Sequence, residues 1–217
     1  MALPAHLQET FSPEEIQFLV EDEMIKIFPR ITTRQRRRKI GNGHSDIEDV
    51  QFRMVTTEDD ALNQMVAMRS TEVKLWIALL LRQQSKCSIV APSWLTVKEL
   101  NRKIQYEKTA TDRFSDLPWN WIVVANLLFS RAADDFHDPV HELRSKIQDL
   151  REIRQTKVLR GLKQLNASHL QLDNLSLLEI NELRPFIVRT MDKLRDVHDA
   201  ANIDGTVGEE DEYDDVM

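Results

Sequence analysis

The sequence predicts a mainly α-helical fold, in which a small α+β N-terminal domain precedes a larger C-terminal helical bundle. Three observations carry this prediction. The 217 residues include only five glycines and seven prolines, which is few for a β-rich protein with many tight turns. Capping boxes of the form Ser/Thr-x-x-Glu mark helix starts at Ser12, Thr96 and Ser176. Residues 140–165 carry apolar side chains at intervals of mostly three and four residues, which is a helical period.

The first 60 residues are predicted to form a small β-rich domain. A short helix begins at Pro13 and ends near Asp22, and the alternating segment Met24–Phe28 is typical of a strand. Residues 30–48 are rich in arginine and glycine and are expected to form a mobile loop. Residues 50–54 alternate again and predict a second strand. A unit this small is marginally stable by itself and is expected to pack on another part of the assembly.

Residues 61–202 are predicted to form the helical domain. A helix should end before Pro185, because proline lacks the backbone N–H that an internal helical position donates. Apolar spacing predicts helices over residues 59–68, 70–81, 97–104, 119–136, 140–165, 176–184 and 186–200.

The net charge of −7 is concentrated at the C-terminal end of the sequence. Residues 203–217 contain seven acidic and no basic residues, which leaves residues 1–202 neutral overall. We therefore expect a disordered acidic tail after the helical domain. A neutral body gives no global electrostatic argument for tight binding of nucleic acid.

Cysteine content and hydropathy predict a soluble intracellular protein. The single cysteine, Cys87, cannot form a disulfide within the chain, which fits a reducing compartment. Residues 1–9 lack an apolar run behind a basic flank, so no signal peptide is expected. The longest apolar run, residues 75–81, is far shorter than the roughly 20 residues that cross a membrane. No membrane partner is expected.

No motif in the sequence predicts catalysis. There is no glycine-rich phosphate loop and no Gly-x-Ser-x-Gly elbow. His137 and His141 have the spacing of metal ligands on a helix, but Pro139 lies between them, so we favour a helix start with Asp138 as its cap. The paired acids at residues 134–135 are interpreted as a solvated helix end, and Cys87 as a buried thiol. We expect no enzyme activity, cofactor, metal or small-molecule substrate.

The basic run admits three interpretations, which the sequence leaves open. It is a nuclear import signal, an arm that contacts phosphates, or a solvated loop. No aromatic residue is interleaved with the basic residues, which weakens an interpretation by base stacking. The residues concerned are Arg34, Arg36, Arg37, Arg38 and Lys39.

Two helical segments carry more apolar surface than one buried face can hide, namely residues 73–81 and 175–187. Trp119 and Trp121 are two residues apart, so we expect one in the core and the other against a partner. The alternative is that all these side chains form the core of the helical domain. The candidate partner-binding residues are Val73, Trp76, Leu79, Leu80, Trp119, Trp121, Leu175, Leu177, Leu178 and Phe186.

Several strings resemble the fungal Psf-two family of the GINS complex. They occur in the family's order at residues 3–7, 11–19, 25–29, 67–73, 75–81, 87–92 and, most specifically, 172–182. The likeness spans most of residues 1–200 but not residues 35–50, so it implies no role for the basic run.

The resemblance implies a function without chemistry. Members of the family form a heterotetramer with the three other GINS subunits. That complex associates with the Mcm ATPase ring and the Cdc-forty-five protein in the replicative helicase, where it is required for initiation and elongation of DNA replication. A nuclear scaffold subunit that meets DNA at most indirectly is therefore expected. The alternative that remains open is a nucleic-acid-binding accessory module acting through the basic run.

Overall fold

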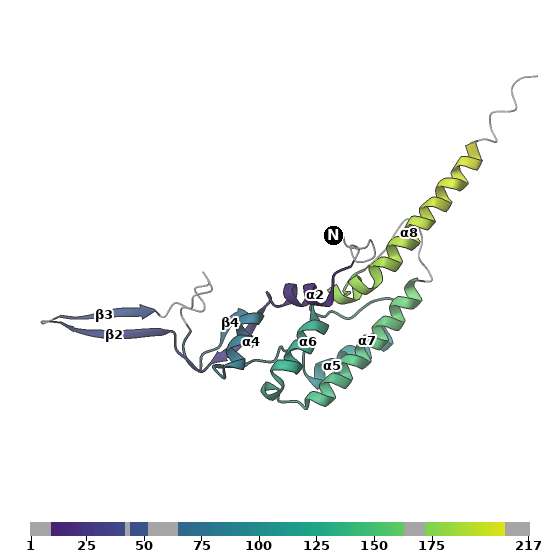
Figure 1. Ribbon diagram of the computed structural model, residues 1–217. Helices are drawn as coiled ribbons and strands as arrows, with labels where there is room; N and C mark the ends of the chain where they lie inside the picture. Colours follow the sequence, from purple (N-terminus) through teal and green to yellow (C-terminus); the bar gives the residue numbers. More distant parts are fainter. Residues whose placement is uncertain (1–9, 42–43, 52–64, 163–171, 207–217) are drawn as a thin grey trace, which may run out of the picture.

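The computed structural model describes residues 10–41, 44–51, 65–162 and 172–206, and its helices and strands follow the predicted fold class (Figure 1). A small three-stranded sheet and a separate hairpin accompany a set of helices that make up most of the described chain. In chain order the elements are α2 (Pro13–Val20), β1 (Met24–Pro29), β2 (Arg34–Gly41), β3 (His44–Gln51), β4 (Thr71–Lys74), α4 (Leu75–Gln83), β5 (Cys87–Ile89), α5 (Val97–Thr109), α6 (Trp121–Arg131), the 3-10 turn η1 (Ala133–Asp135), α7 (Val140–Leu162) and α8 (Leu177–Thr206).

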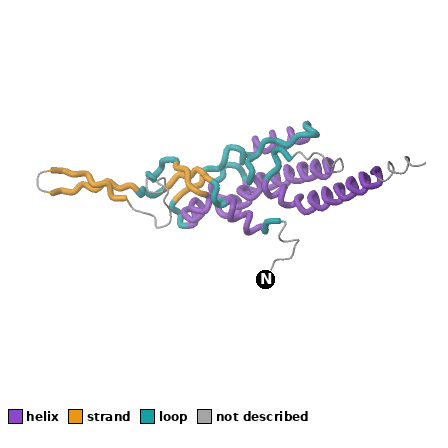
Figure 2. The backbone as a smooth tube through the Cα atoms, turned by 90° about the horizontal axis from the view of Figure 1, so that it is seen from above, coloured by secondary structure: helices purple, strands orange, loops and turns teal. Residues whose placement is uncertain are grey.

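The three-stranded sheet has β1 in the middle, with β4 and β5 paired antiparallel to its two edges. Successive side chains on a strand point to opposite faces. In β1 the odd-numbered residues, including Ile25 and Ile27, are therefore buried, whereas Met24 and Phe28 are exposed. Helix α4 packs on the buried face of this sheet (Figure 2). The predicted strand at residues 24–28 is confirmed.

The helical body packs around α7, which contacts both α5 and α6. Leu143 and Leu150 of α7 are fully buried, as are Trp121 and Leu128 of α6. One continuous apolar core joins these helices to α4 and the sheet. The prediction of a helix start at Thr96 is confirmed, because its hydroxyl accepts the backbone N–H of Glu99.

The basic run is a strand rather than the predicted loop. Residues 34–41 pair antiparallel with residues 44–51 to form a hairpin, whose register leaves two residues, Asn42 and Gly43, between Gly41 and His44. Asn-Gly between two strand-forming segments is a strong hairpin signal. In this register three basic residues have an acidic residue as their Cα partner. The second strand lies at residues 44–51, and residues 52–54 of the predicted strand lie outside the described residues.

The predicted helix over residues 70–81 is divided into β4 and α4. Residues 71–74 pair with β1 in register, and the helix begins only at Leu75. A short apolar run fits a buried strand as well as a buried helix. The spacing of apolar residues in this segment therefore could not show that its first part is a strand. The sheet thus takes two strands from beyond residue 60, although the domain boundary near that residue stays a prediction. The helix expected at residues 59–68 falls largely outside the described residues, and residues 65–70 are not helical.

Helix α8 continues through Pro185, where the sequence predicted two separate helices. A proline inside a helix removes one backbone hydrogen bond and costs roughly 3 kcal/mol or more. The apolar positions Leu183, Ile187 and Leu194 keep helical spacing across the proline, and Ile187 is buried. Residues 203–206, predicted as part of the tail, belong to α8, and residues 207–217 lie outside the described residues.

Candidate interaction surfaces

The ten candidate partner-binding residues fall into three groups by exposure. Those buried within the chain are Val73, Leu79, Trp121 and Leu175. Those half-buried are Trp76, Leu177 and Leu178. Those exposed are Leu80, Trp119 and Phe186. Burial inside the chain accounts for the first group, as the core alternative expected. That any of the ten residues contacts a partner stays a prediction. The three exposed residues could make such a contact without a change in the fold of the chain.

Trp119 and Trp121 lie two residues apart but differ in their exposure to solvent. Trp121 is 0% exposed and Trp119 is 51% exposed. The backbone oxygen of Trp119 accepts the N–H of Leu177, the first residue of α8. The exposed indole therefore lies at the junction between the start of α6 and the start of α8.

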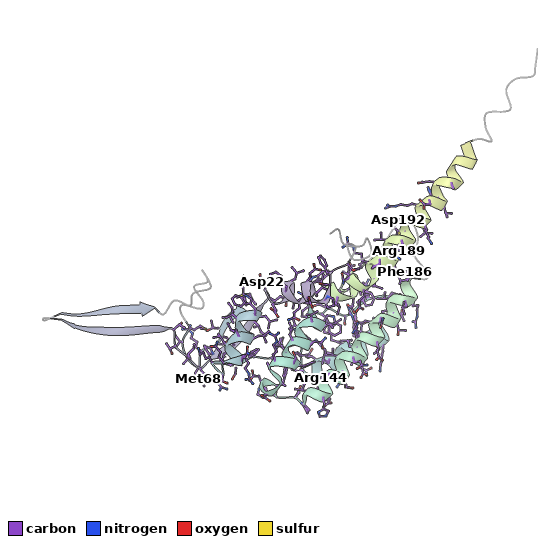
Figure 3. The ribbon with its side chains drawn as sticks, viewed as in Figure 1. Asp22, Met68, Arg144, Phe186, Arg189 and Asp192 are labelled. Carbon is purple, nitrogen blue, oxygen red and sulfur yellow. The ribbon has the colours of Figure 1, made fainter. Side chains whose placement is uncertain are left out.

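An apolar groove with a volume of about 320 Å³ runs between the C-terminal half of α7 and the N-terminal half of α8. Its lining includes Val158, Leu159 and Leu162 of α7, with Leu183 and Phe186 of α8. Leu159 and Phe186 are each 55% exposed, which is high for large apolar side chains on packed helices. Figure 3 shows Phe186 where α8 passes the end of α7.

Beyond the groove, α8 extends away from the body of the molecule (Figure 1). Its apolar residues continue at Ile187, Met191, Leu194 and Val197, and Val197 is 68% exposed. Gaps of three and four residues are the spacing that packs against another helix. Arg189 and Asp192 lie on the same extended part of the helix (Figure 3). The groove and this stripe, defined by Leu159, Phe186 and Val197, are called the α8 surface below.

The N-terminal half of the molecule carries further exposed apolar side chains. Phe18 and Leu19 of α2 are exposed, as are Met24 and Phe28 on the open face of the sheet. These residues are scattered over α2 and β1, and none of the four lines the groove between α7 and α8 as the structure describes it. The α8 surface, in contrast, combines a groove with a helical stripe.

A buried arginine fixes the start of α8 against the body. Arg154 of α7 is 0% exposed. Its Nε and Nη2 donate to the two carboxylate oxygens of Glu179 at 2.7 and 2.9 Å, which is a bidentate pair. Its Nη1 donates to Glu107 Oε1 of α5 at 2.9 Å. Helices α5, α7 and α8 thus meet at a single guanidinium.

The same arginine also orders the turn before α8. Asn174 is in the left-handed region with φ of 62°, which asparagine tolerates better than most residues. Its backbone oxygen accepts from Arg154 Nη2 at 2.6 Å, and its side chain donates to the backbone oxygen of Phe114. The guanidinium carbon lies 5.0 Å from the centre of the Phe114 ring. Arg154 is therefore paired, hydrogen-bonded and stacked, so its burial is compensated.

Both carboxylates of this cluster remain ionised. Burial disfavours the charged form of Glu179, but hydrogen bonds and attraction from Arg154 outweigh it and lower the pKa below its usual value. Burial likewise opposes ionisation of Glu107, and hydrogen bonds from Lys157 and Ser115 lower its pKa. We call Arg154, Glu107, Glu179 and Lys157 the buried ion cluster.

The buried ion cluster predicts a loss of stability in acid. Because the pKa values of Glu107 and Glu179 are lower in the folded chain than the ordinary 4.5, their contribution is complete above that pH. It is lost as the pH falls below 4.5 through the folded-state values. We expect the free energy of urea unfolding to fall as the pH is lowered below about 4.5. Glu179→Gln should be less stable at pH 7 but lose less on acidification, and equal losses in the two proteins would contradict this assignment.

The cluster was not predicted from the sequence. Buried positions of α7 fall at Leu143, Ile147, Leu150 and Arg154, with gaps of four, three and four. The sequence signal for the cluster was Arg154 itself, because the helical spacing of buried positions predicts an apolar residue there. The sequence analysis also did not single out Leu159, which lies outside the apolar stripe of residues 140–165.

The other residues that were considered for catalysis make structural contacts. Asp134 and Asp135 both accept from Arg82, and Asp135 also accepts the backbone N–H of Ile89. These bonds connect η1 to α4 and β5. Cys87 is buried, as predicted, and burial raises the pKa of its thiol to about 11.

His137 and His141 are both exposed, and the described residues contain no group of three potential metal ligands. Asp138, expected to cap α7, instead accepts the backbone N–H of Val97 and so connects to α5. Among the described helices none is long and apolar enough to cross a membrane.

Comparison with known proteins is decisive for the family. The family model named Sld5 and described as "GINS complex protein helical bundle domain" matches residues 94–198. The "DNA replication complex GINS protein PSF2" of Candida glabrata is 78% identical over 212 residues, which is 98% of this chain and 99% of the relative. The chain belongs to the PSF2 family of GINS proteins.

Relatives with lower sequence identity show the same family. The protein of the same name from Saccharomyces cerevisiae is 71% identical over 98% of this chain and 99% of the relative. The one from Schizosaccharomyces pombe is 36% identical over 91% of this chain and 96% of the relative. The resemblance seen in the strings of the sequence is confirmed. The matched helical bundle contains α5, α6, α7 and most of α8, and hence the buried ion cluster and the α8 surface.

Proposed function

We propose that this chain is a non-catalytic structural subunit of the GINS complex in DNA replication, and that it docks to other GINS subunits through the α8 surface. The observation that carries the docking proposal is the apolar groove between α7 and α8, continued by the helical stripe of α8. The names of the PSF2 relatives support membership of the replication complex.

The chemistry of the α8 surface suits a protein helix as its partner. Leu159 and Phe186 offer apolar area, and an exposed aromatic on a rigid helix is a typical anchor of an interface. Arg151 and Glu182 at the rim pair with each other at 2.6 Å, so they leave no unpaired charge for a partner to bury. Spacing of three and four residues along α8 fits a partner that is itself helical.

The proposal extends to location and to the next level of assembly. A subunit of a DNA replication complex is expected to work in the nucleus. The resemblance to the family further implies that the assembled complex meets the Mcm ATPase ring and the Cdc-forty-five protein. In that arrangement this chain supplies rigid surface and makes at most indirect contact with DNA through its helical body.

Co-expression tests the proposed function. The chain should be produced together with the three other GINS subunits, with an affinity tag on one of those three. We expect an equimolar four-subunit complex after size-exclusion chromatography, because an apolar docking surface is stabilised when a partner covers it. A soluble chain that elutes alone, while the other subunits associate without it, would overturn the proposal.

A further inference from the structure

The first turn of α8 is bound by the N-terminal segment of the chain. The side-chain oxygen of Asn181 accepts the backbone N–H of Phe11 at 2.8 Å, and its side-chain nitrogen donates to the backbone oxygen of Phe11 at 2.9 Å. The amide thus makes the two hydrogen bonds that a residue of a neighbouring strand would make. The two residues are 170 positions apart in the sequence. This pair of bonds is called the Phe11–Asn181 clamp.

The clamp is connected to the body of the molecule through α2. Ser12 caps this helix: its hydroxyl accepts the backbone N–H of Glu15, and the Glu15 carboxylate accepts the backbone N–H of Ser12. Ile16 and Val20 of α2 belong to the apolar core, and α2 packs on α6. Figure 1 shows the start of α2 beside the start of α8. The clamp therefore connects α8 to a packed part of the chain.

The clamp and the buried ion cluster hold α8 from opposite sides. Successive residues of a regular α-helix are about 100° apart around its axis, so Asn181 lies about 160° from Glu179. Glu179 is the residue that Arg154 binds, and it lines the groove between α7 and α8 together with Phe186. Phe186 and Val197 both lie within about 20° of Glu179 around the helix. Asn181 is therefore on the face of α8 opposite the α8 surface.

Pro185 weakens α8 one turn after the clamp. Proline has no backbone N–H, so it cannot donate to the backbone oxygen of Asn181, four residues earlier. Proline is a common site of bends in helices. Val197 lies about 24 Å beyond Asn181 along a regular helix, so a tilt of about 10° at this point moves Val197 by roughly 4 Å. Dispersion contacts weaken once a gap of about 1 Å opens, so such a tilt would break contacts along the stripe.

We infer that Asn181 is a positioning residue for docking, which holds α8 in the direction that its surface needs in order to meet a partner. The inference rests on the proposed function of the α8 surface. Because Asn181 lies on the opposite face, it acts through the direction of the helix and makes no contact with the docked partner. A helix held in this direction before association has less conformational freedom to lose when the partner binds.

The direction of α8 is measured in the isolated full-length chain. Spin labels at Val197→Cys on α8 and at Gln148→Cys, an exposed position of α7, give a distance distribution by double electron–electron resonance. The native Cys87 is buried and should not be labelled. We expect Asn181→Ala to widen the distribution by about 4 Å, the displacement that a tilt of about 10° produces. Asn181→Asp keeps only the acceptor for the N–H of Phe11 and should widen it less.

Two control variants separate the clamp from general loosening of the chain. Phe11→Ala keeps the backbone groups that Asn181 binds. Asn101→Ala removes an exposed amide from α5. Both variants should leave the distance distribution unchanged, and urea unfolding shows whether each variant remains folded. An unchanged distribution in Asn181→Ala, or equal widening in either control, would overturn the inference.

Recovery of the chain through a tagged GINS subunit is the second readout. Asn181→Ala should lower the affinity about 10-fold, which is what one or two hydrogen bonds contribute. Asn181→Asp should lower it less, and Asn101→Ala should assemble like the unsubstituted chain. A widened distribution with unchanged recovery would overturn the role of Asn181 in docking. Failure of the unsubstituted chain to assemble would instead overturn the proposed function, and the distances in the isolated chain distinguish the two cases.

Discussion

Arg154→Met should lower the free energy of unfolding by about 3–5 kcal/mol, the cost of removing one partner from a buried ion pair. The substitution leaves Glu179 without its bidentate donor and Glu107 without one of its cations, in a site where both carboxylates are nearly inaccessible to water. The midpoint of thermal unfolding should fall by roughly 6–20 °C for a chain of this length. Calorimetry or urea unfolding of the complete chain measures the effect.

Arg151→Met is the matched control for this prediction. Arg151 lies three residues earlier on the same helix and pairs with Glu182, but both side chains are 42% exposed. An exposed pair contributes at most about 1 kcal/mol. Adding Glu179→Gln to Arg154→Met should recover part of the lost stability, because it removes an unpaired buried charge. Similar costs for Arg151→Met and Arg154→Met would refute the assigned role of the buried ion cluster.

Phe186→Asp should prevent or greatly weaken assembly with the other GINS subunits while leaving the chain folded. Phe186 is 55% exposed in the chain, so the substitution removes little buried area on folding but places a charge in the proposed apolar contact. Loss of an aromatic anchor at an interface costs about 2–4 kcal/mol, which corresponds to a drop in affinity of roughly 30-fold to 1,000-fold. Recovery of the variant through a tagged partner subunit measures this loss.

Val188→Asp is the control for the assembly assay. Val188 is 41% exposed on the same helix, two residues further on, and lies away from the stripe formed by Leu183, Ile187 and Leu194. An aspartate there carries the same charge and the same helix propensity. Equal loss of assembly with Phe186→Asp and Val188→Asp would show that charge on α8 in general, rather than its apolar stripe, governs recovery.

The sequence predicted correctly those helices and strands whose local pattern also matches their burial in the folded chain. The strand at residues 24–28 alternates and is half-buried, and Thr96 caps a helix that also buries Leu100. The hairpin was missed although Asn-Gly at residues 42–43 is a hairpin signal, because the run of basic residues before it was interpreted as a loop. The strand at residues 71–74 was missed because its identity depends on pairing with β1, which periodicity does not report.

The candidate site was predictable in part for the same reason. Apolar excess pointed to Phe186, which is exposed, and equally to Leu175, which is core. The two tryptophans divide as their spacing predicted, with Trp121 in the core and Trp119 exposed. Only packing separates the two kinds of residue. The buried ion cluster joins residues 107, 154 and 179, which are distant in the sequence, and long-range ion pairs leave no periodic trace. Its one sequence signal is Arg154 at a buried position of α7.

The central claim, that α8 docks through its apolar stripe in the assembled complex, is tested most directly by cysteine labelling. Val197→Cys places a thiol on the stripe at a position 68% exposed, and the native Cys87 is buried and should not react. Ser93→Cys, at an exposed loop position outside the α8 surface, is the control. The account predicts that maleimide labels Val197→Cys rapidly in the isolated chain and much more slowly in the four-subunit complex, while Ser93→Cys reacts at one rate in both. Equally fast labelling of Val197→Cys in the chain and in the complex would contradict the claim.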